Sequence, residues 1–304
     1  MANFQVNILG CGSATPSVRH MPACQVIDFR DRLFMIDCGE GAQLQMMRQR
    51  LKFSRLSHIF ISHLHGDHFL GLPGLLSTLA LHEKGGKLTI HTFAEGARIL
   101  QEIMAVFCRE TSFEICYNII KPERAVIFED HALTVETFPL YHRVPCVGFK
   151  FSEKPKARHL RGDMIKFFNI PVSRLGDIRQ GADYVTPDGT IISNERLTTP
   201  ADPSVSYAYC SDTMYNPTVA EYVKGVDVLY HESTYADDFA EKAAPRGHST
   251  AREAGRIAAA AGVGRLVLGH YSKAYDSEEP FLREALEEFP NVIAAREGLK
   301  IDLL

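Results

Sequence analysis

The sequence of 304 residues predicts a layered α/β fold. Three observations predict it. Short runs of alternating or wholly apolar residues recur along the chain, as they do in β-strands. Stretches with the apolar spacing of helices separate these runs, and such alternation is typical of sheets covered by helices. Because 45% of the residues are apolar and 23% are charged, the chain is also long enough to bury a large core.

The first half of the chain carries most of the expected strands. Residues 4–9 form an apolar run that ends in a glycine-rich turn, Gly10-Cys11-Gly12-Ser13. Two alternating runs flank the dipeptide Arg30-Asp31, which predicts a hairpin. In chain order we expect strands over residues 4–9, 24–29, 32–37, 58–62, 88–91 and 133–138, with helices over 42–49 and 95–107.

The second half repeats the pattern, with strands expected over residues 206–210, 226–230 and 265–268. A helix is expected to begin at Ser249 or Thr250, because Glu253 follows in the first turn as in a capping box. This helix ends at Gly262, and a last helix spans roughly residues 280–289.

One stretch, about residues 153–185, interrupts the regular pattern. It holds seven Lys or Arg against four Asp or Glu, a local charge of +3, which leaves −7 for the rest of a chain with net charge −4. Two prolines and three glycines break it up. We expect a single domain over residues 1–304 with this stretch as an inserted basic arm. A solvated surface loop is the alternative.

Composition excludes several classes of protein. A net charge of −4 argues against a polycation that holds nucleic acid by composition alone, although it allows a local basic patch. The first residues lack the pattern of a signal peptide, and no apolar run is long enough for a membrane span. The seven cysteines are scattered without a C-x-x-C pair, which favours reduced, mostly buried thiols and a cytoplasmic protein.

The most informative segment is a cluster of three histidines and one aspartate within six residues: His63, His65, Asp67 and His68. The cluster directly follows the buried strand expected over residues 58–62. Imidazole with carboxylate is the ligand set of Zn²⁺, with Mn²⁺ and Fe harder to exclude. Four ligands are too many for one catalytic site that keeps an open position, so two metal ions fit better.

Two metals need further ligands from elsewhere, including a carboxylate that can bridge them. Three later candidates each sit just after an expected strand, as the first cluster does: His142, Asp212 and His270.

With these motifs, the sequence resembles the metallo-β-lactamase superfamily, whose signature H-x-H-x-D-H is matched at residues 63–68. Within it, the chain is most similar to the ribonuclease Z family. The likeness rests on motifs in the family's order along nearly the whole chain: Gly39-Glu40-Gly41 after Asp37, residues 63–75, Val147-Gly148-Phe149, Ser211-Asp212-Thr213, His231-Glu232-Ser233-Thr234, His248-Ser249-Thr250 and Gly269-His270-Tyr271-Ser272.

The resemblance implies a four-layer αββα sandwich of the metallo-β-lactamase type with an inserted arm, and two zinc ions per chain. One ion would be held by His63, His65, His142 and Asp212. The other would be held by Asp67, His68, Asp212 and His270, so that Asp212 bridges.

The resemblance also implies catalytic roles. His248, paired with Glu232, is the candidate proton donor to the leaving group, against the alternative that it is a plain residue at a helix N-terminus. Asp67 is a further candidate for accepting a proton from the attacking water. Asp37 is implied to support the metal loop rather than to bind metal.

The implied substrate is precursor tRNA, from which the enzyme would remove the 3′ trailer, acting as a homodimer in which one subunit's arm serves the other's active site. Arg19, Ser272 and Lys273 are the candidate substrate contacts. Two departures stand out. The arm lacks the Gly-Pro pair usual in the family, and Lys273 replaces an arginine that relatives often carry one position later.

Two other functions remain open from the sequence. The same scaffold serves hydrolases of small phosphodiesters, thioesters or sulfate esters, because fold does not fix substrate. The arm and the pairing of Glu232 with His248 favour the nuclease. A non-enzymatic RNA-binding protein is disfavoured, because the metal-ligand set looks complete.

Overall fold

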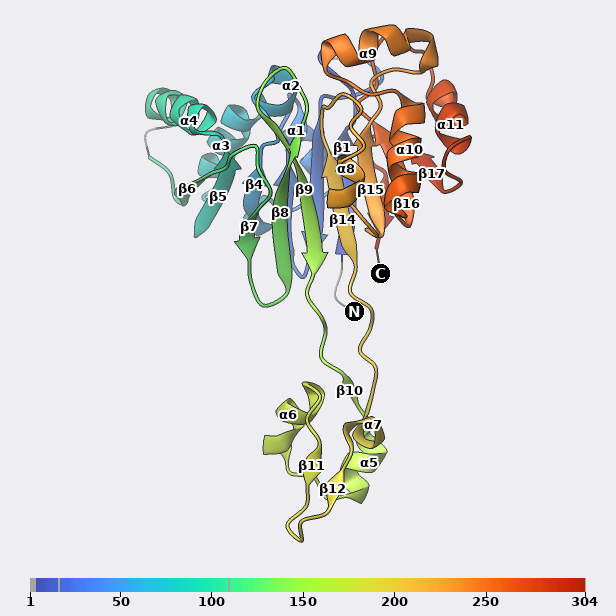
Figure 1. The fold of residues 1–304 in the computed structure, drawn as a ribbon. Coiled ribbons are helices and arrows are strands. Elements are labelled where there is room, and N and C mark those ends of the chain that lie inside the picture. The colour runs from blue at the N-terminus through green and yellow to red at the C-terminus, as the bar shows by residue number, and fades with distance from the viewer. Residues whose placement is uncertain (1–3, 16, 109, 304) are drawn as a thin grey trace. The chain divides into compact units, whose positions relative to one another are not determined.

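The structure, a computed structural model, describes residues 4–15, 17–108 and 110–303, which form two compact units (Figure 1). The first unit comprises residues 1–129, 135–151 and 206–304, apart from the positions outside the described ranges. The second comprises residues 130–134 and 152–205, and so contains the stretch 153–185 expected to form the arm. No described helix is long and apolar enough to cross a membrane.

The first unit contains two sheets of seven strands each. In the first sheet the order is β18-β1-β2-β3-β4-β5-β6, and the pairs from β3 to β6 are parallel. Its strands are β1 (Phe4–Gly10), β2 (Cys24–Phe29), β3 (Arg32–Ile36), β4 (Leu56–Phe60), β5 (Lys87–Thr92), β6 (Glu114–Ile119) and β18 (Lys300–Asp302).

The second sheet has the order β17-β16-β15-β14-β9-β8-β7, and the four strands from β14 to β17 are parallel. Its strands are β7 (Ala125–Glu129), β8 (Leu133–Leu140), β9 (Cys146–Glu153), β14 (Ser206–Cys210), β15 (Val228–Glu232), β16 (Arg265–Gly269) and β17 (Val292–Ala294).

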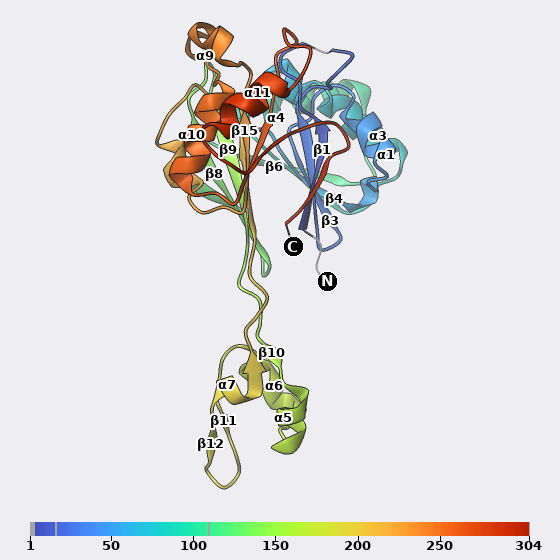
Figure 2. The ribbon, with the colours of Figure 1, turned by 90° about the vertical axis from the view of Figure 1, so that its right-hand side faces the viewer.

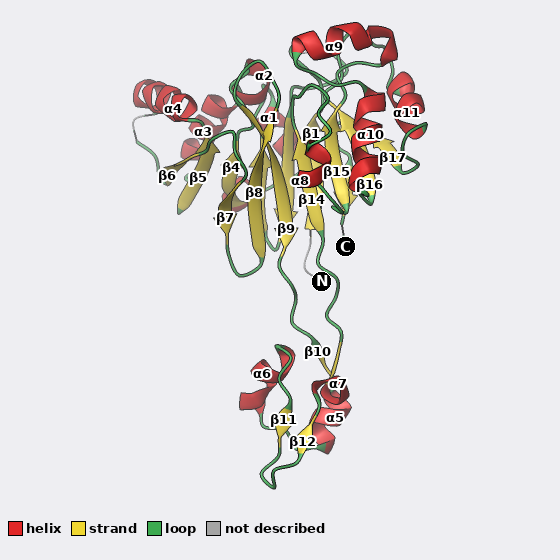
Figure 3. Ribbon diagram, viewed as in Figure 1, coloured by secondary structure: helices red, strands yellow, loops and turns green. Residues whose placement is uncertain are grey.

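Helices cover the outer face of each sheet, which gives the predicted αββα layers (Figures 2 and 3). On the first sheet lie α1 (Ala42–Arg48), α3 (Leu72–Leu81) and α4 (Ala94–Phe107). On the second lie α8 (Val219–Tyr222), which is labelled in Figure 1, α10 (Ala251–Ala261) and α11 (Glu279–Leu286). The short elements α2 (Gly66–Phe69), α9 (Ala240–Arg246), η1 (Phe53–Arg55) and η3 (Asp237–Phe239) lie in connections.

Aromatic side chains fill the space between the two sheets. Phe60 on β4 packs against Phe149 and Phe151 on β9, with ring centroids 5.5 and 5.3 Å apart. Phe34 on β3 contacts Phe151 edge-on at 6.4 Å. Because all four rings are fully buried, they fix the sheets against each other and thereby the strand ends that carry the site.

The predicted local signals are confirmed. Arg30 and Asp31 join β2 and β3 with positive φ angles of 47° and 62°, the geometry of a two-residue type I′ hairpin turn. Thr250 is the N-cap of α10, and its side chain and that of Glu253 form a reciprocal capping box. The helix ends at Gly262, which has a left-handed φ of 61°.

Three strands have boundaries that differ from the prediction by two residues, among them β8, which ends at Leu140 rather than at residue 138. β4 spans Leu56–Phe60 rather than 58–62, although a hydrogen bond from Ile61 N to His91 O (2.9 Å) prolongs its contact with β5. β15 spans Val228–Glu232 rather than 226–230, so His231 and Glu232 end the strand instead of following it. Prediction also omitted several elements, among them β6, β7, β9 and α3, although Leu72, Leu75, Leu76 and Leu79 of α3 follow the helical spacing i, i+3, i+4 and i+7.

The second unit has a small core of its own, made of Ile170, Ile178, Tyr184, Ile192 and Leu197. Two short antiparallel pairs frame it, β10 (His159–Leu160) with β13 (Thr198–Thr199) and β11 (Tyr184–Val185) with β12 (Ile191–Ile192). Its helical segments are α5 (Gly162–Phe167), η2 (Val172–Arg174), α6 (Leu175–Arg179) and α7 (Asn194–Leu197).

Candidate metal centre and active site

Strand ends of both sheets supply the candidate metal ligands. His63 and His65 lie in the loop after β4, and Asp67 and His68 lie in the first turn of α2, which begins at Gly66. The second sheet supplies the three ligand candidates that follow β8, β14 and β16: His142, Asp212 and His270. Carboxyl ends of parallel strands share one edge of a sheet, which is where sites form in such folds.

The first group of ligand atoms surrounds one point. His65 Nδ1 lies 3.1 Å from His63 Nε2 and 3.2 Å from His142 Nε2. Asp212 Oδ2 lies 3.6 and 3.8 Å from the same two Nε2 atoms. These four residues are the ones predicted to hold the first metal.

The second group lies on the other side of Asp212. His68 Nε2 and His270 Nε2 are 3.3 Å apart, and each is 3.4 Å from Asp67 Oδ2. Asp212 Oδ1 lies 3.4 Å from the His68 nitrogen and 3.2 Å from that of His270. One oxygen of Asp212 therefore faces each group, as a bridging carboxylate requires.

The donor set fits divalent metal. Two nitrogens bound at about 2.0–2.1 Å in a tetrahedron are about 3.3 Å apart, close to the nitrogen–nitrogen distances of 3.1–3.3 Å in both groups. Asp212 Oδ1 is buried without a hydrogen-bond partner among the described residues, which is costly for an anionic oxygen unless a cation faces it.

The far nitrogens of the ligand histidines are held in place. His142 Nδ1 donates to Gly247 O (2.7 Å), His68 Nδ1 donates to Asp37 Oδ2 (2.7 Å), and His270 Nδ1 donates to Thr234 Oγ1 (2.9 Å). His63 Nδ1 contacts Ser62 Oγ at 3.1 Å. Such contacts fix the ring tautomer and direct Nε2 toward the metal.

Asp37 lies behind the metal loop and outside both ligand groups. Its Oδ1 accepts from Ser62 N (2.8 Å), and its Oδ2 accepts from Tyr209 OH (2.8 Å) and from His68 Nδ1. The carboxylate is fully buried. Its geometry is that of a support for the loop, as the resemblance implied.

Asp37 and the ligand His270 have positive φ angles of 54° and 63°. Residues other than glycine adopt this region at a cost and keep it where the surrounding structure imposes it. Both residues directly follow the end of a strand, and their left-handed backbone conformation turns the chain sharply toward the site.

Glu232, which is fully buried, and His248, which is partly buried, form a pair beside Asp212. His248 Nδ1 donates to Glu232 Oε1 at 3.0 Å and lies 3.9 Å from Asp212 Oδ2. Glu232 also accepts from three backbone amides, those of Thr213, Thr234 and Ser249, at 2.9–3.1 Å. These hydrogen bonds hold the carboxylate in place, and the carboxylate orients the imidazole of His248 through Nδ1.

Burial and neighbouring charges shift the pKa values of the site. Burial, with the adjacent histidines, holds the pKa of His63 well below its ordinary value, which leaves the ring neutral and able to bind metal. Burial also lowers the pKa of His248, but Glu232, by its charge and hydrogen bond, outweighs this and raises the pKa to about 9. His248 is therefore protonated at neutral pH in the metal-free chain.

Gly247 supports the site in a way that the sequence analysis missed. Its φ is +76°, and a Cβ added there would lie 2.6 Å from His142 Nδ1, the atom that bonds to its carbonyl. The residue must therefore be glycine both for its backbone angle and for the close approach of the histidine ring.

We expect Gly247→Ala to weaken metal binding by about 10–100-fold, the usual effect of disturbing a group that orients a ligand. Metal retention against a chelator measures this. Gly225→Ala is the matched control, because Gly225 also has a positive φ (+67°) but a Cβ there meets no atom within 4 Å. Equal metal loss in both variants would attribute the effect to backbone strain alone.

The candidate substrate contacts gather beside the site. Arg19, Ser272 and Lys273 all line one hollow of about 190 Å³, together with His20 and Tyr275. The guanidinium of Arg19 already donates to Tyr275 O at 2.9 Å and pairs with Glu278. Arg19 and Lys273 are both exposed.

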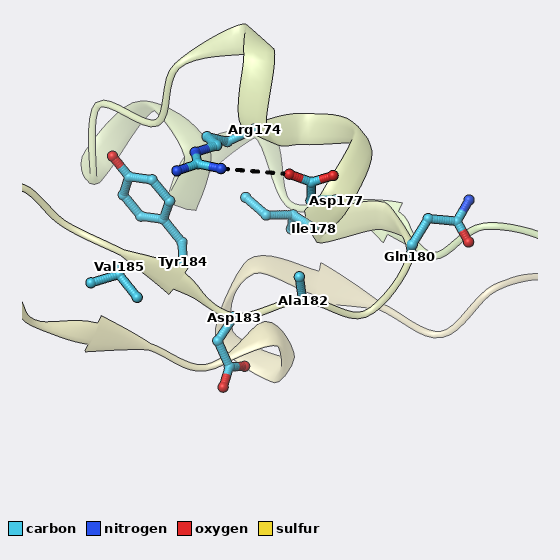
Figure 4. A pocket seen from close by; sticks show the side chains of 8 residues that line it. All are labelled: Arg174, Asp177, Ile178, Gln180, Ala182, Asp183, Tyr184 and Val185. Atoms are coloured by element: carbon cyan, nitrogen blue, oxygen red, sulfur yellow. Dashed lines mark ion pairs between the residues drawn. The ribbon is translucent and has the colours of Figure 1, made fainter.

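The positive charge expected over residues 153–185 is balanced when the charged residues of the whole second unit are counted. The return of the chain after residue 185 adds Arg196 but also three acids, and residues 130–134 add one more, so eight Lys or Arg face eight Asp or Glu. Figure 4 shows a pocket of about 420 Å³ in this unit, where Arg174 pairs with Asp177 at 3.7 Å.

Sequence reasoning found all seven ligand candidates and missed several of their partners, among them Ser62, Tyr209, Thr234 and Gly247. Thr234 Oγ1 contacts Glu232 Oε2 at 2.8 Å and His248 Nδ1 at 3.1 Å, besides His270. Its position within the motif His231-Glu232-Ser233-Thr234 was the available signal.

Comparisons with known proteins show the family and the fold. The sequence model of the family described as "Anti-Pycsar protein Apyc1" matches residues 4–164. A protein named Ribonuclease Z from Parabacteroides distasonis is 48% identical over 304 residues, which cover 100% of both chains. Another of that name from Phocaeicola vulgatus is 49% identical, over 100% of this chain and 98% of its own.

Solved structures show the same fold. Human tRNase Z, short form, superposes with a TM-score of 0.74 at 24% identity, covering 99% of each chain. The metallo-β-lactamase fold protein YhfI from Bacillus subtilis gives a TM-score of 0.71 at 18% identity, covering 99% of this chain and 100% of its own. The superposition with YhfI shows the metallo-β-lactamase fold, which the Apyc1 match over residues 4–164 accompanies. The full-length identity with the curated relatives shows that the chain belongs to the ribonuclease Z family.

Proposed function

We infer that this protein is a metal-dependent endoribonuclease that removes the 3′ trailer of precursor tRNA by phosphodiester hydrolysis. Membership of the ribonuclease Z family supports this function. The observation that carries the chemistry is the placement of two ligand groups on opposite oxygens of Asp212, with the Glu232–His248 pair beside them.

We propose that two zinc ions per chain occupy these groups, the first on His63, His65, His142 and Asp212. Asp67, His68 and His270 hold the second with Asp212. Bound in this way, the pair of ions supplies an activated water at neutral pH and neutralises charge on the phosphate. The histidine-rich donor set favours zinc over magnesium or calcium, which prefer oxygen ligands.

The leaving group is the 3′-oxygen of the tRNA, and it needs a proton as the bond breaks. Glu232 holds His248 by Nδ1, so the other ring nitrogen, Nε2, is the one that can deliver the proton. Thr234 and the backbone amides around Glu232 keep this pair in one geometry.

Asp67 is the proposed acceptor of a proton from the attacking water. Its Oδ2 accepts from Ala14 N at 2.7 Å. Although burial opposes it, the charges of His68 and His270 hold the pKa of Asp67 well below its ordinary value. Asp67 therefore stays ionised, which favours metal binding and limits its strength as a base.

The second unit is the proposed tRNA-binding arm, and the enzyme is proposed to act as a homodimer in the cytoplasm, where precursor tRNA would be met. Among the cationic side chains of the arm, Lys156, Arg161 and Arg174 pair with carboxylates. Fewer free charges remain to contact phosphates than the sequence count suggested, so the arm's electrostatic contribution should be modest.

Excision of the arm tests this assignment. Glu153 N donates to Val205 O at 2.9 Å, so residues 154–204 can be replaced by an Asn-Gly turn without stretching the chain. We expect weaker binding of precursor tRNA, with a shallower salt dependence, and unchanged hydrolysis of bis(p-nitrophenyl) phosphate. Rates on both substrates are compared for the intact and armless proteins.

An equal loss on both substrates would assign the arm to folding or dimerisation instead. Mapping the cut on precursors with and without CCA completes the test. Cleavage just past the discriminator base with a 3′-hydroxyl is the expected product, and hydrolysis of the small diester alone would favour the other hydrolases of this scaffold.

A further inference from the structure

Arg143 stands next to the metal centre without an assigned role. It directly follows the ligand candidate His142 in the turn between β8 and β9, and it lines a hollow of about 270 Å³ together with His65 and Asp67. Ala14, Glu40, Gly66 and Leu70 complete the lining. Arg143 is the only Lys or Arg among these lining residues.

The turn that carries Arg143 is fixed on both sides. Tyr141 N donates to Thr213 Oγ1 (3.0 Å), and Met214 N donates to Tyr141 O (2.8 Å). His142 is held by the Gly247 carbonyl, and Val147 N donates to Ser62 O (3.0 Å). The backbone of Arg143 is therefore set in register with the metal ligands.

Arg143 is exposed, and it lines the same hollow as the carboxylates of Glu40 and Asp67. Across residues 4–15, 17–108 and 110–303, no ion pair or side-chain hydrogen bond engages its guanidinium. Arg19, Arg55 and Arg252, in contrast, each pair with a carboxylate.

We propose that Arg143 binds the scissile phosphate through its guanidinium in the hollow that it shares with His65 and Asp67. The proposal rests on the proposed function, in that the ligand is a phosphodiester of RNA. The planar fork of an arginine matches two oxygens of a phosphate, and such charge-assisted contacts are the strong ones. As water adds to the phosphorus, negative charge grows on the non-bridging oxygens, and a fixed cation stabilises that charge.

The test uses two substrates that differ in their number of phosphates. Precursor tRNA has many, whereas bis(p-nitrophenyl) phosphate has only the scissile one. We expect Arg143→Ala to lower kcat/KM by about 10²–10³-fold on both, and Arg143→Lys to recover part of the loss because it restores a point charge without the fork. We also expect the inhibition constant of inorganic phosphate to rise about tenfold or more in Arg143→Ala.

The control is Arg98→Ala on α4, which removes an exposed arginine that pairs with Glu102, and it should change none of these values. Metal content should be the same in all four proteins. A loss confined to precursor tRNA would move the contact to a flanking phosphate and overturn the proposal. Loss of metal in parallel with activity, or no loss on the small diester, would also overturn it.

Failure of the proposed function gives a different pattern. If the wild type leaves precursor tRNA intact but hydrolyses the small diester, the RNA assignment fails. The role of Arg143 would still be supported if Arg143→Ala lowered diester hydrolysis and weakened inhibition by phosphate.

Discussion

Asp212→Ala should remove metal from both ligand groups at once and abolish most of the activity. Oδ2 of Asp212 faces His63 and His142, and Oδ1 faces His68 and His270, so the substitution removes one carboxylate oxygen from each group. Metal catalysis supplies several kcal/mol of transition-state stabilisation, which corresponds to about 10³-fold or more in rate. Metal analysis and the rate on bis(p-nitrophenyl) phosphate measure the two effects.

Asp302→Ala serves as the control for this prediction, because Asp302 is an exposed aspartate that hydrogen-bonds only Gln5 among the described side chains. It should keep full metal content and activity. If Asp212→Ala also retained two metals, the bridging role would be wrong, and if it lost only one, Asp212 would belong to a single group.

His248→Gln should lower kcat by about 10²–10⁴-fold, the usual contribution of a general acid, while metal content and RNA affinity remain close to those of the wild type. The reason is that His248 lies outside the two predicted ligand sets and is held by Glu232 instead. Metal analysis, RNA binding and kcat are measured together. His82→Gln, at an exposed histidine, is the control.

The pH profile gives this prediction a second readout. Glu232 raises the pKa of His248 above its ordinary value of 6.5, to about 9, so the protonated form is present at neutral pH and is lost as the pH rises through the pKa. The wild-type rate should therefore have a limb that falls with rising pH, and His248→Gln should lack it. Loss of zinc as the main effect would make His248 a ligand.

The sequence predicted those site residues whose signal lies in their own stretch of chain, and it missed those that act on the site from a distant position. His63 to His68 form one contiguous motif, and His142, Asp212 and His270 each follow a strand whose apolar run is easily read. Gly247 acts on His142 through its carbonyl and from 105 positions away, so no side-chain pattern marks it. Tyr209 reaches Asp37 from the other sheet, which only the packed structure reveals.

The charge of the arm was misjudged for a related reason. The sequence window stopped at residue 185, whereas the compact unit continues to Val205 and includes residues 130–134. The returning chain brings Asp188, Glu195 and Asp202, which balance the basic residues of the outgoing half. The net charge therefore has to be counted over the whole folded unit, whose apolar core includes Ile192 and Leu197 beyond the end of that window.

The hydrogen bond between Glu153 N and Val205 O has an evolutionary consequence. The excursion leaves and re-enters the catalytic sandwich at neighbouring residues, and its interior is filled by its own side chains. A single contiguous stretch of coding sequence therefore specifies nearly all of it. As the proposed tRNA-binding element, that stretch could be gained, lost or exchanged while the residues of the candidate metal centre keep their positions, so substrate recognition and chemistry would be free to diverge at different rates within one lineage.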